Sequence, residues 1–149
     1  MGMFTAFNIN ASGMTAQRYR MDVISENVAN ANTTRTEDGT PYRRKVVTFE
    51  EKGQGTGNFG SVFKSASNKY VGNGVKVSQV TEDTWTEMNE VYDPSHPDAD
   101  ENGYVTYPNV NIVAEMTNLI DASRAYEANA TAFTASKSMA MQGLNVGKS

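Results

Sequence analysis

The feature that most constrains this chain is a heptad repeat of apolar residues near its C-terminus. Two series spaced by seven run beside each other: Ile112, Leu119, Tyr126, Phe133 and Ala140, and Met116, Ser123, Ala130, Lys137 and Leu144. Apolar residues held at such a and d positions are typical of a helix that packs along another helix. No Gly or Pro interrupts residues 109–142. The sequence therefore predicts one long helix, capped by Asn109 or Asn111 and ending near Gly143.

A helix of this length is too long for a compact domain built from this chain. Roughly 32 residues at about 1.5 Å each give about 48 Å. A globule of this chain length is only about 40 Å across. Part of the apolar stripe would then have no cover within one chain, so the pattern indicates surface that packs against other chains.

A second amphipathic segment lies at the N-terminus. Its apolar residues recur at seven-residue spacing, with one more beside them: Phe7, Met14, Met21, Val28 and Ile24. The spacing predicts a helix over about residues 10–30, with Ser12 as its cap and Gly13 weakening its first turn. We expect this helix to pair with the C-terminal one and to cover part of its longer stripe.

The middle of the chain predicts short strands and turns. Candidate strands lie at residues 45–49, 84–86 and 104–107, and a candidate hairpin spans 70–77 around Gly72-Asn73-Gly74. The fold class is therefore α+β, with terminal helices that pair as a coiled-coil-like domain. We expect that domain to comprise residues 1–31 and 109–149, and a β-rich domain with a Gly-rich loop to comprise residues 32–108.

Composition excludes several classes of site. The 149 residues include no Cys, which rules out disulfides, thiolate metal sites and cysteine nucleophiles. The net charge of -4 argues against a nucleic-acid binder, which normally has a basic face. No apolar run approaches the roughly 18–20 residues of a membrane span, and the first residues show no cleavable signal peptide. Both a cytoplasmic protein and one exported by a leaderless route fit these features.

Two patterns resemble ligand sites, and each lacks a required part. Residues 55–60 match G-x-G-x-x-G, but residues 61–64 do not open the helix that would hold a pyrophosphate. Asp98–Gly103 fits the opening of a calcium loop, but its twelfth position is Asn109, where a bidentate Glu is needed. A weak calcium-binding module on Asp98–Asn109 is kept as an alternative.

Other polar groups have structural interpretations. His96 is the only histidine and lies between Pro94 and Pro97, so no histidine pair or cluster can form. We expect Arg43-Arg44-Lys45 to form salt bridges or a subunit contact, because the chain as a whole is acidic. The sequence predicts no catalytic residue, no bound cofactor and no metal site, and indicates a protein that is not an enzyme.

Short sequence motifs lie at both ends of the chain. Residues 23–34 contain the pattern N-x-A-N-x-x-T, and two further motifs lie at residues 110–116 and 124–129. These motifs resemble the N-terminal signature and the shared C-terminal motif of the bacterial flagellar rod and hook axial proteins. The delayed Gly39 and Pro41–Lys45, together with residues 91–105, resemble a proximal rod subunit. The positions that carry the family motif are Asn27, Ala29, Asn30, Thr33, Tyr42, Arg43, Arg124, Tyr126 and Asn129.

The resemblance implies a subunit of the flagellar rod, the shaft that crosses the periplasm. Such a subunit is exported without a cleaved signal by the flagellar type III apparatus, polymerises helically, transmits torque and lines the export channel. The implied partners are copies of itself, the rod proteins FlgB, FlgF, FlgG and FliE, and the MS-ring, with no nucleic acid and no membrane insertion. Another rod subunit of the same family is a second alternative, beside the calcium-binding module.

The resemblance also implies roles for single residues. Asn27, Asn30 and Asn32 would end the first helix, where Asn accepts left-handed dihedral angles and satisfies free carbonyls. Tyr126 and Phe133 would anchor helix–helix contacts. The full set expected at subunit interfaces is Phe7, Met14, Met21, Ile24, Val28, Ile112, Met116, Leu119, Tyr126, Ala130, Phe133, Ala140 and Leu144.

Overall fold

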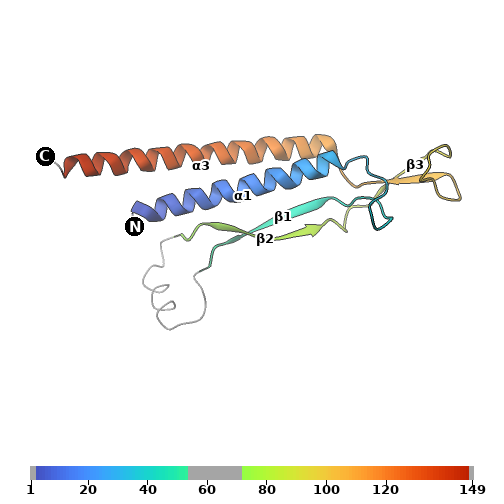
Figure 1. Cartoon of the computed structure of the whole chain (residues 1–149), viewed down its shortest axis with the longest axis horizontal. Helices are drawn as coiled ribbons and strands as arrows, with labels where there is room; N and C mark the ends of the chain where they lie inside the picture. The colour runs from blue at the N-terminus through green and yellow to red at the C-terminus, as the bar shows by residue number, and fades with distance from the viewer. Residues whose placement is uncertain (1–2, 54–71, 148–149) are drawn as a thin grey trace, which may run out of the picture. The chain divides into compact units, whose positions relative to one another are not determined.

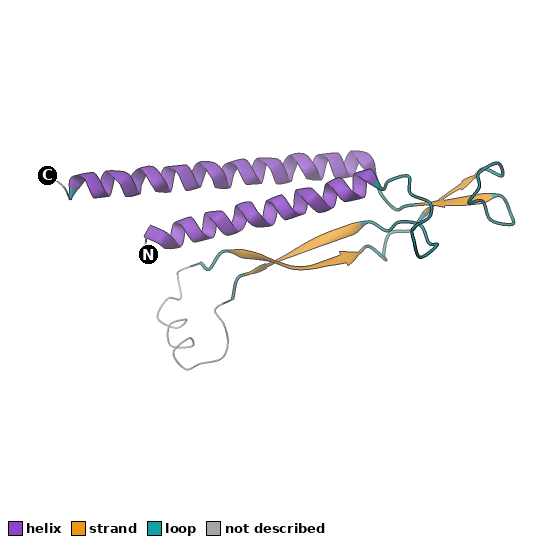
Figure 2. Cartoon of the chain, viewed as in Figure 1, coloured by secondary structure: helices purple, strands orange, loops and turns teal. Residues whose placement is uncertain are grey.

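In the part of the chain that the structure describes, two long helices lie at the ends and four strands lie between them in sequence (Figures 1 and 2). The computed structural model describes residues 3–53 and 72–147. The elements are α1 (Met3–Ala29), β1 (Lys45–Glu51), β2 (Val75–Glu82), β3 (Asn89–Tyr92), β4 (Tyr104–Tyr107) and α3 (Ile112–Val146). β1 pairs with β2, and β3 pairs with β4. The predicted α+β class is confirmed.

The chain divides into two compact units, which are described separately. Unit 1 comprises residues 1–18, 49–78 and 123–149, and unit 2 comprises residues 19–48 and 79–122. Each unit contains residues of α1, α3, β1 and β2. The division into a helical domain and a β-rich domain stays a prediction.

The first helix begins earlier than predicted. It starts at Met3, so the predicted cap Ser12 lies inside it. The Ser12 hydroxyl donates to the Ile9 carbonyl at 2.7 Å and accepts from the Val75 amide at 3.1 Å. Packing of Phe7 against Phe133 accompanies the additional turns, with ring centroids 5.0 Å apart. The prediction of Ser12 as cap was therefore wrong.

The C-terminal helix α3 begins where the sequence predicted. The Asn111 side-chain oxygen accepts from the amides of Val113 and Ala114 at 3.0 and 3.2 Å, which is the hydrogen bonding of an N-cap. The helix continues through the predicted stop at Gly143 and ends at Val146. A single Gly weakens a helix by about 1 kcal/mol, which is too little to end a helix of 35 residues.

The long strands confirm one prediction, and the residues after β2 correct another. β1 contains the predicted strand 45–49, and it runs antiparallel to β2, since Asp83 N–H donates to the Arg44 carbonyl and Lys52 N–H to that of Gly74. Of the predicted hairpin 70–77, residues 70–71 lie outside the described residues, and 75–77 pair with β1 as part of β2. Residues 84–86 form a turn, not a strand, because the Asp83 carboxylate accepts from the Trp85 and Thr86 amides.

β3 and β4 pair antiparallel as a hairpin. Its register pairs Asn89 with Tyr107, Val91 with Val105 and Tyr92 with Tyr104. The rings of Tyr92 and Tyr104 meet edge to face, 5.3 Å apart. The sequence predicted β4 but not β3.

The buried core is concentrated in unit 2. Its buried apolar residues are Val23, Ile24, Ala31, Tyr42, Val105 and Ala122. Three polar side chains are buried with them, those of Asn27, Asn109 and Glu115. Among the described residues of unit 1, only Ala16 is buried. The helix segments of unit 1 therefore have much less internal support than those of unit 2.

Candidate subunit-interface site

Asn27 of α1 binds the first residue of β1. Its side-chain oxygen accepts from the Lys45 amide at 2.8 Å, and its side-chain N–H₂ donates to the Lys45 carbonyl at 2.9 Å. The oxygen also accepts from the Tyr42 hydroxyl at 2.9 Å, and the N–H₂ donates to Glu115 Oε2 at 3.0 Å. Asn27 is fully buried with its hydrogen-bonding capacity used, which is the usual requirement for a buried amide.

Glu115 of α3 is the buried anion of this cluster. Its side chain is 1% exposed, and its Oε1 atom accepts from Nε and Nη2 of Arg44, both at 2.8 Å. A buried carboxylate is tolerated where a charged partner and further hydrogen bonds compensate its lost hydration. Arg44 and Asn27 supply both, so Glu115 joins α3 to β1 and to α1 within unit 2.

Asn109, just before α3, binds the backbone just before β1 and just after β2. Its oxygen accepts from the Arg44 amide at 2.9 Å, and its N–H₂ donates to the carbonyls of Asp83 and Thr86 at 2.8 and 3.2 Å. The hydrogen bond from the Thr86 side chain is the largest cause that lowers the pKa of Asp83. The Asp83 carboxylate therefore stays ionised beside Arg44, with the guanidinium 3.5 Å away.

Tyr42 completes the cluster. Burial raises the pKa of its hydroxyl to about 12, and the negative charge of Glu26 adds to this effect. The hydroxyl is therefore a proton donor to Asn27 at all physiological pH values. Lys45 forms an ion pair with Glu26, and its ammonium lies 5.7 Å from the centre of the Tyr42 ring. The predicted salt bridges of the Arg43-Arg44-Lys45 segment are thus present for Arg44 and Lys45.

The other motif asparagines act locally. The Asn30 side chain donates to the Glu26 carbonyl at 3.0 Å, as expected for a residue that satisfies the end of a helix, and accepts from the Thr33 hydroxyl at 3.1 Å. Asn32 and Ala29 are exposed. Among the described residues only glycines have positive φ angles. The prediction of left-handed asparagines was therefore wrong.

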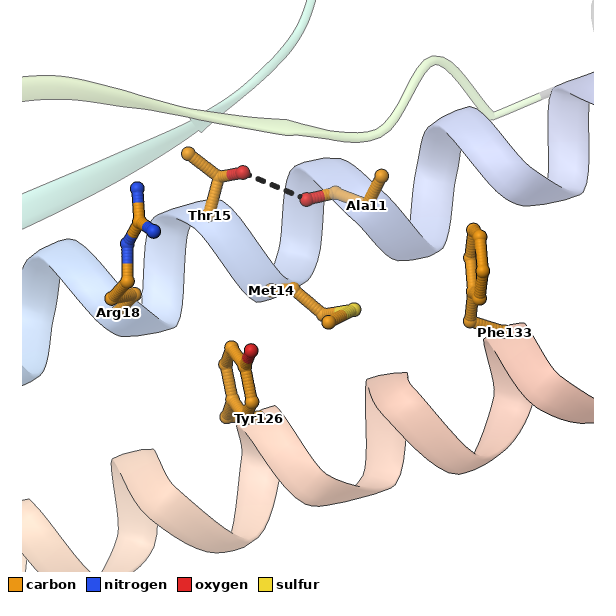
Figure 3. Close-up of a pocket in the computed structure, with 6 residues that line it drawn as sticks. All are labelled: Ala11, Met14, Thr15, Arg18, Tyr126 and Phe133. Atoms are coloured by element: carbon orange, nitrogen blue, oxygen red, sulfur yellow. Dashed lines mark hydrogen bonds between the residues drawn. The ribbon is translucent and has the colours of Figure 1, made fainter.

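In unit 1 the two helices leave a groove between them (Figure 3). It has a volume of about 270 Å³ and is lined by Ala11, Met14, Thr15, Arg18, Tyr126 and Phe133. Figure 3 shows Met14 pointing from α1 into the space into which Tyr126 and Phe133 point from α3. Both predicted anchors thus line an open apolar surface.

The α3 residues that face α1 differ by one position from the second predicted heptad series. Glu115 bonds to Asn27 in unit 2, and Asn129 lies against Gly13 in unit 1. Glu115, Ala122 and Asn129 stand seven apart, one position before Met116, Ser123 and Ala130 of that series. Packing buries Glu115 and leaves Met116 55% exposed. The assignment of the Met116 series to contacts with other chains stays a prediction.

The remaining expected interface residues have a range of exposures. Ile24 is buried, and Ile112, Met116 and Leu144 are exposed. The half-buried members are Phe7, Met14, Met21, Val28, Leu119, Tyr126, Ala130, Phe133 and Ala140. Of the motif residues, Arg43 is half-buried and Arg124 exposed. The assignment of these residues to subunit contacts stays a prediction.

Sequence reasoning did not assign Glu115, Arg44 and Asn109 to one cluster. An acidic residue inside the apolar repeat of a helix is one usable signal, since a carboxylate there needs a cation. The basic segment at Arg44 supplies that cation 71 residues earlier in the chain. Only the fold brings the two together.

The polar side chains of the candidate calcium loop form hydrogen bonds within the protein. Asp98 accepts from the Thr34 hydroxyl, and Asp100 accepts from the amides of Asn102 and Tyr104 within the β3–β4 turn. His96 Nδ1 accepts from the Asp98 amide. In the described part of the chain no group of three or more His, Asp or Glu residues could hold a metal ion. Residues 55–60 lie outside the described residues.

Among residues 3–53 and 72–147, neither helix combines the length and the apolar character needed to cross a bilayer.

Comparison with known proteins gives matches at both ends and over the full length. A family model described as "Flagella basal body rod protein" matches residues 7–35, and one described as "Flagellar basal body rod FlgEFG protein C-terminal" matches residues 101–146. The flagellar basal-body rod protein FlgC of Bacillus subtilis is 47% identical over 99% of this chain and 100% of its own length. FlgC of Borreliella burgdorferi is 43% identical over 98% of each chain, and that of Salmonella typhimurium 39% over 99% and 100%. The chain therefore belongs to the FlgC family of flagellar basal-body rod proteins.

Proposed function

We propose that this chain is a structural subunit of the bacterial flagellar basal-body rod and that it polymerises through α1 and α3. Its similarity to FlgC proteins over nearly the whole chain supports the first part. The apolar surface that α3 leaves exposed supports the second. Assembly with copies of itself and with other flagellar rod proteins follows from both.

One stripe of α3 in unit 2 carries the argument for polymerisation. Ile112, Val113, Met116 and Ile120 are 44, 75, 55 and 55% exposed. Residues spaced by four lie on one face of a helix, so these side chains form a continuous apolar stripe. Burying such side chains contributes about 1.5–3 kcal/mol each. A neighbouring helix is the partner that best matches the shape of a helical stripe.

The finer parts of the proposal follow from the family. In the rod the subunit transmits torque across the periplasm, and its helices line the export channel. Its export proceeds through the flagellar type III apparatus without a cleaved signal. The neighbours we propose are FlgB, FlgF, FlgG and FliE, with the MS-ring at the base. The chain acts by assembly, not as an enzyme.

Substitutions in the exposed stripe test polymerisation without disturbing the buried cluster. Met116→Asp and Ile120→Asp should change the free energy of unfolding of the purified chain by no more than about 0.5 kcal/mol, because both side chains are exposed. Each should prevent incorporation into rods and stop swimming. Met116→Leu and Ile120→Leu keep the stripe apolar and should swim normally. Normal rods built from Met116→Asp would contradict the proposal.

A further inference from the structure

The C-terminal end of α3 has the surface of a buried helix, although it is exposed. Residues 138–146 include no charged side chain. Met139, Met141 and Leu144 are 66, 56 and 65% exposed. A helix face that remains in water normally carries charged residues. These turns are therefore suited to burial against another molecule.

The groove of unit 1 is an apolar surface large enough for one or two large apolar side chains. Its volume of about 270 Å³ falls just below the roughly 300–1,000 Å³ of typical small-molecule pockets. It is about nine times the roughly 30 Å³ that one water molecule takes in the liquid. The walls formed by Met14, Tyr126 and Phe133 suit one or two large apolar side chains. A small molecule would be held less completely.

Charge at the two surfaces is also complementary. Arg18 lines the groove and is exposed, and no acidic side chain in the described ranges forms an ion pair with it. The last turn of α3 carries no basic side chain, and the C-terminal end of a helix bears a partial negative charge. The nearest basic residue in the sequence, Lys148, follows the helix. A cation at a helix C-terminus is stabilising.

The groove cannot accept the end of its own helix. Leu144 follows Phe133 by eleven residues in one continuous α3, which places it about 16 Å further along the helix axis. The occupant must come from another molecule. A second copy of the chain has both the apolar tip and the groove.

We propose that the segment Met139–Leu144 of one copy docks in the unit 1 groove of a second copy, with Arg18 facing the terminal carbonyls of the docked helix. The inference rests on the proposed rod function and names the partner of one of its surfaces. The two surfaces differ, so the contact is heterologous. Such contacts repeat from copy to copy into an open helical series instead of closing a dimer.

Cysteine cross-linking tests this contact because the natural chain has no Cys. Cells that lack the chromosomal gene express Met14→Cys and Leu144→Cys as two separate chains, and mild oxidation follows. We expect a disulfide-linked pair of copies at least about tenfold above that formed by Met14→Cys with Val113→Cys, the matched control. Adding Arg18→Gln should reduce the yield about twofold to fivefold, whereas Arg20→Gln should not.

The outcomes separate this inference from the rod function itself. Swimming of the cells reports rod function, and Ala11→Cys with Met139→Cys replaces the first pair if either variant does not swim. A chain carrying both cysteines should give a ladder of higher multimers. Swimming cells in which the two variants do not cross-link above the control would overturn the inference and leave the rod function intact. Cells that swim without the gene would overturn the rod function.

Discussion

Asn27 pairs with Lys45 as a neighbouring strand would. The side-chain amide of Asn27 accepts from the Lys45 N–H at 2.8 Å and donates to the Lys45 carbonyl at 2.9 Å. The end of α1 is thereby fixed to the start of β1 by two hydrogen bonds between the Asn27 side chain and the Lys45 backbone. Tyr42 and Glu115 use the remaining capacity of the same amide.

Asn27→Asp should destabilise unit 2 strongly. The substitution keeps the shape of the side chain but removes the N–H₂ that donates to Lys45 and Glu115, and it places a second carboxylate beside Glu115. We expect the free energy of unfolding to fall by about 2–5 kcal/mol, measured by urea titration with circular dichroism. Asn32→Asp changes an exposed residue and should stay within about 0.5 kcal/mol. A loss below about 1 kcal/mol for Asn27→Asp would refute the assigned role.

The stability losses from replacing Arg44 and Glu115 one at a time should add up to more than the loss from replacing both together. Each single replacement leaves the other side chain without its charged partner. Glu115→Ala leaves the guanidinium and the Asn27 amide without their acceptor, and should cost about 3–5 kcal/mol. The double variant Arg44→Met with Glu115→Leu should cost at least about 1 kcal/mol less than the sum of its two single variants. Glu50→Ala, which breaks the exposed pair with Lys76, should cost no more than about 1 kcal/mol. Additive single effects at Arg44 and Glu115 would show that the two side chains do not couple.

Stability should fall at alkaline pH because of Tyr42. Burial raises the pKa of its hydroxyl from the usual 10.0 to about 12 in the folded chain, so the folded state holds the proton to higher pH than the unfolded state does. The unfolded chain is therefore favoured as the pH rises through 10 toward 12. Tyr42→Phe should cost about 1 kcal/mol at pH 7, because Asn27 loses a donor. It should show a smaller loss of stability between pH 10 and 12 than the natural chain, and equal losses in the two chains would refute the assignment.

The elements that the sequence predicted are those with local signals. The heptad spacing of Leu119, Tyr126 and Phe133 and the cap at Asn111 are written in consecutive residues, and both predicted an existing helix. The start of α1 was placed too late, because Gly13 is a weak helix former in isolation. In the fold Gly13 lies where α3 approaches α1, and a close approach is a reason to keep Gly in a helix.

The buried cluster was not predictable in the same way. Asn27 was expected to end a helix, which is what Asn often does locally. Its actual partners Lys45 and Glu115 are 18 and 88 residues away in the chain. β3 was missed for a related reason, since its four residues are all exposed and show no alternation. Only its pairing with β4 makes it a strand.

Asn129 packs so closely against Gly13 that replacing this helical Gly by Ala should not give the usual gain in stability. A Cβ on Gly13 would lie 2.8 Å from Asn129 Oδ1 and 3.0 Å from its Cγ atom, and the Asn129 N–H₂ is held by the Ala125 carbonyl. In an open helix Gly→Ala stabilises by about 1 kcal/mol. Here that gain is opposed by an overpacking cost of about 1–3 kcal/mol. Gly13→Ala should therefore be neutral or destabilising in the natural chain.

Removal of the Asn129 side chain should make Gly13→Ala stabilising, as Gly→Ala normally is in a helix. In an Asn129→Ala background Gly13→Ala should stabilise the chain by up to about 1 kcal/mol, because the new methyl group no longer meets Asn129. Gly143→Ala is the matched control, since nothing lies within 4 Å of its Cβ position, and it should stabilise either background by a few tenths to about 1 kcal/mol. Thermal unfolding of the four combinations at positions 13 and 129 gives the coupling directly. A Gly13→Ala effect that is the same in both backgrounds would show that the helices do not approach closely at this point.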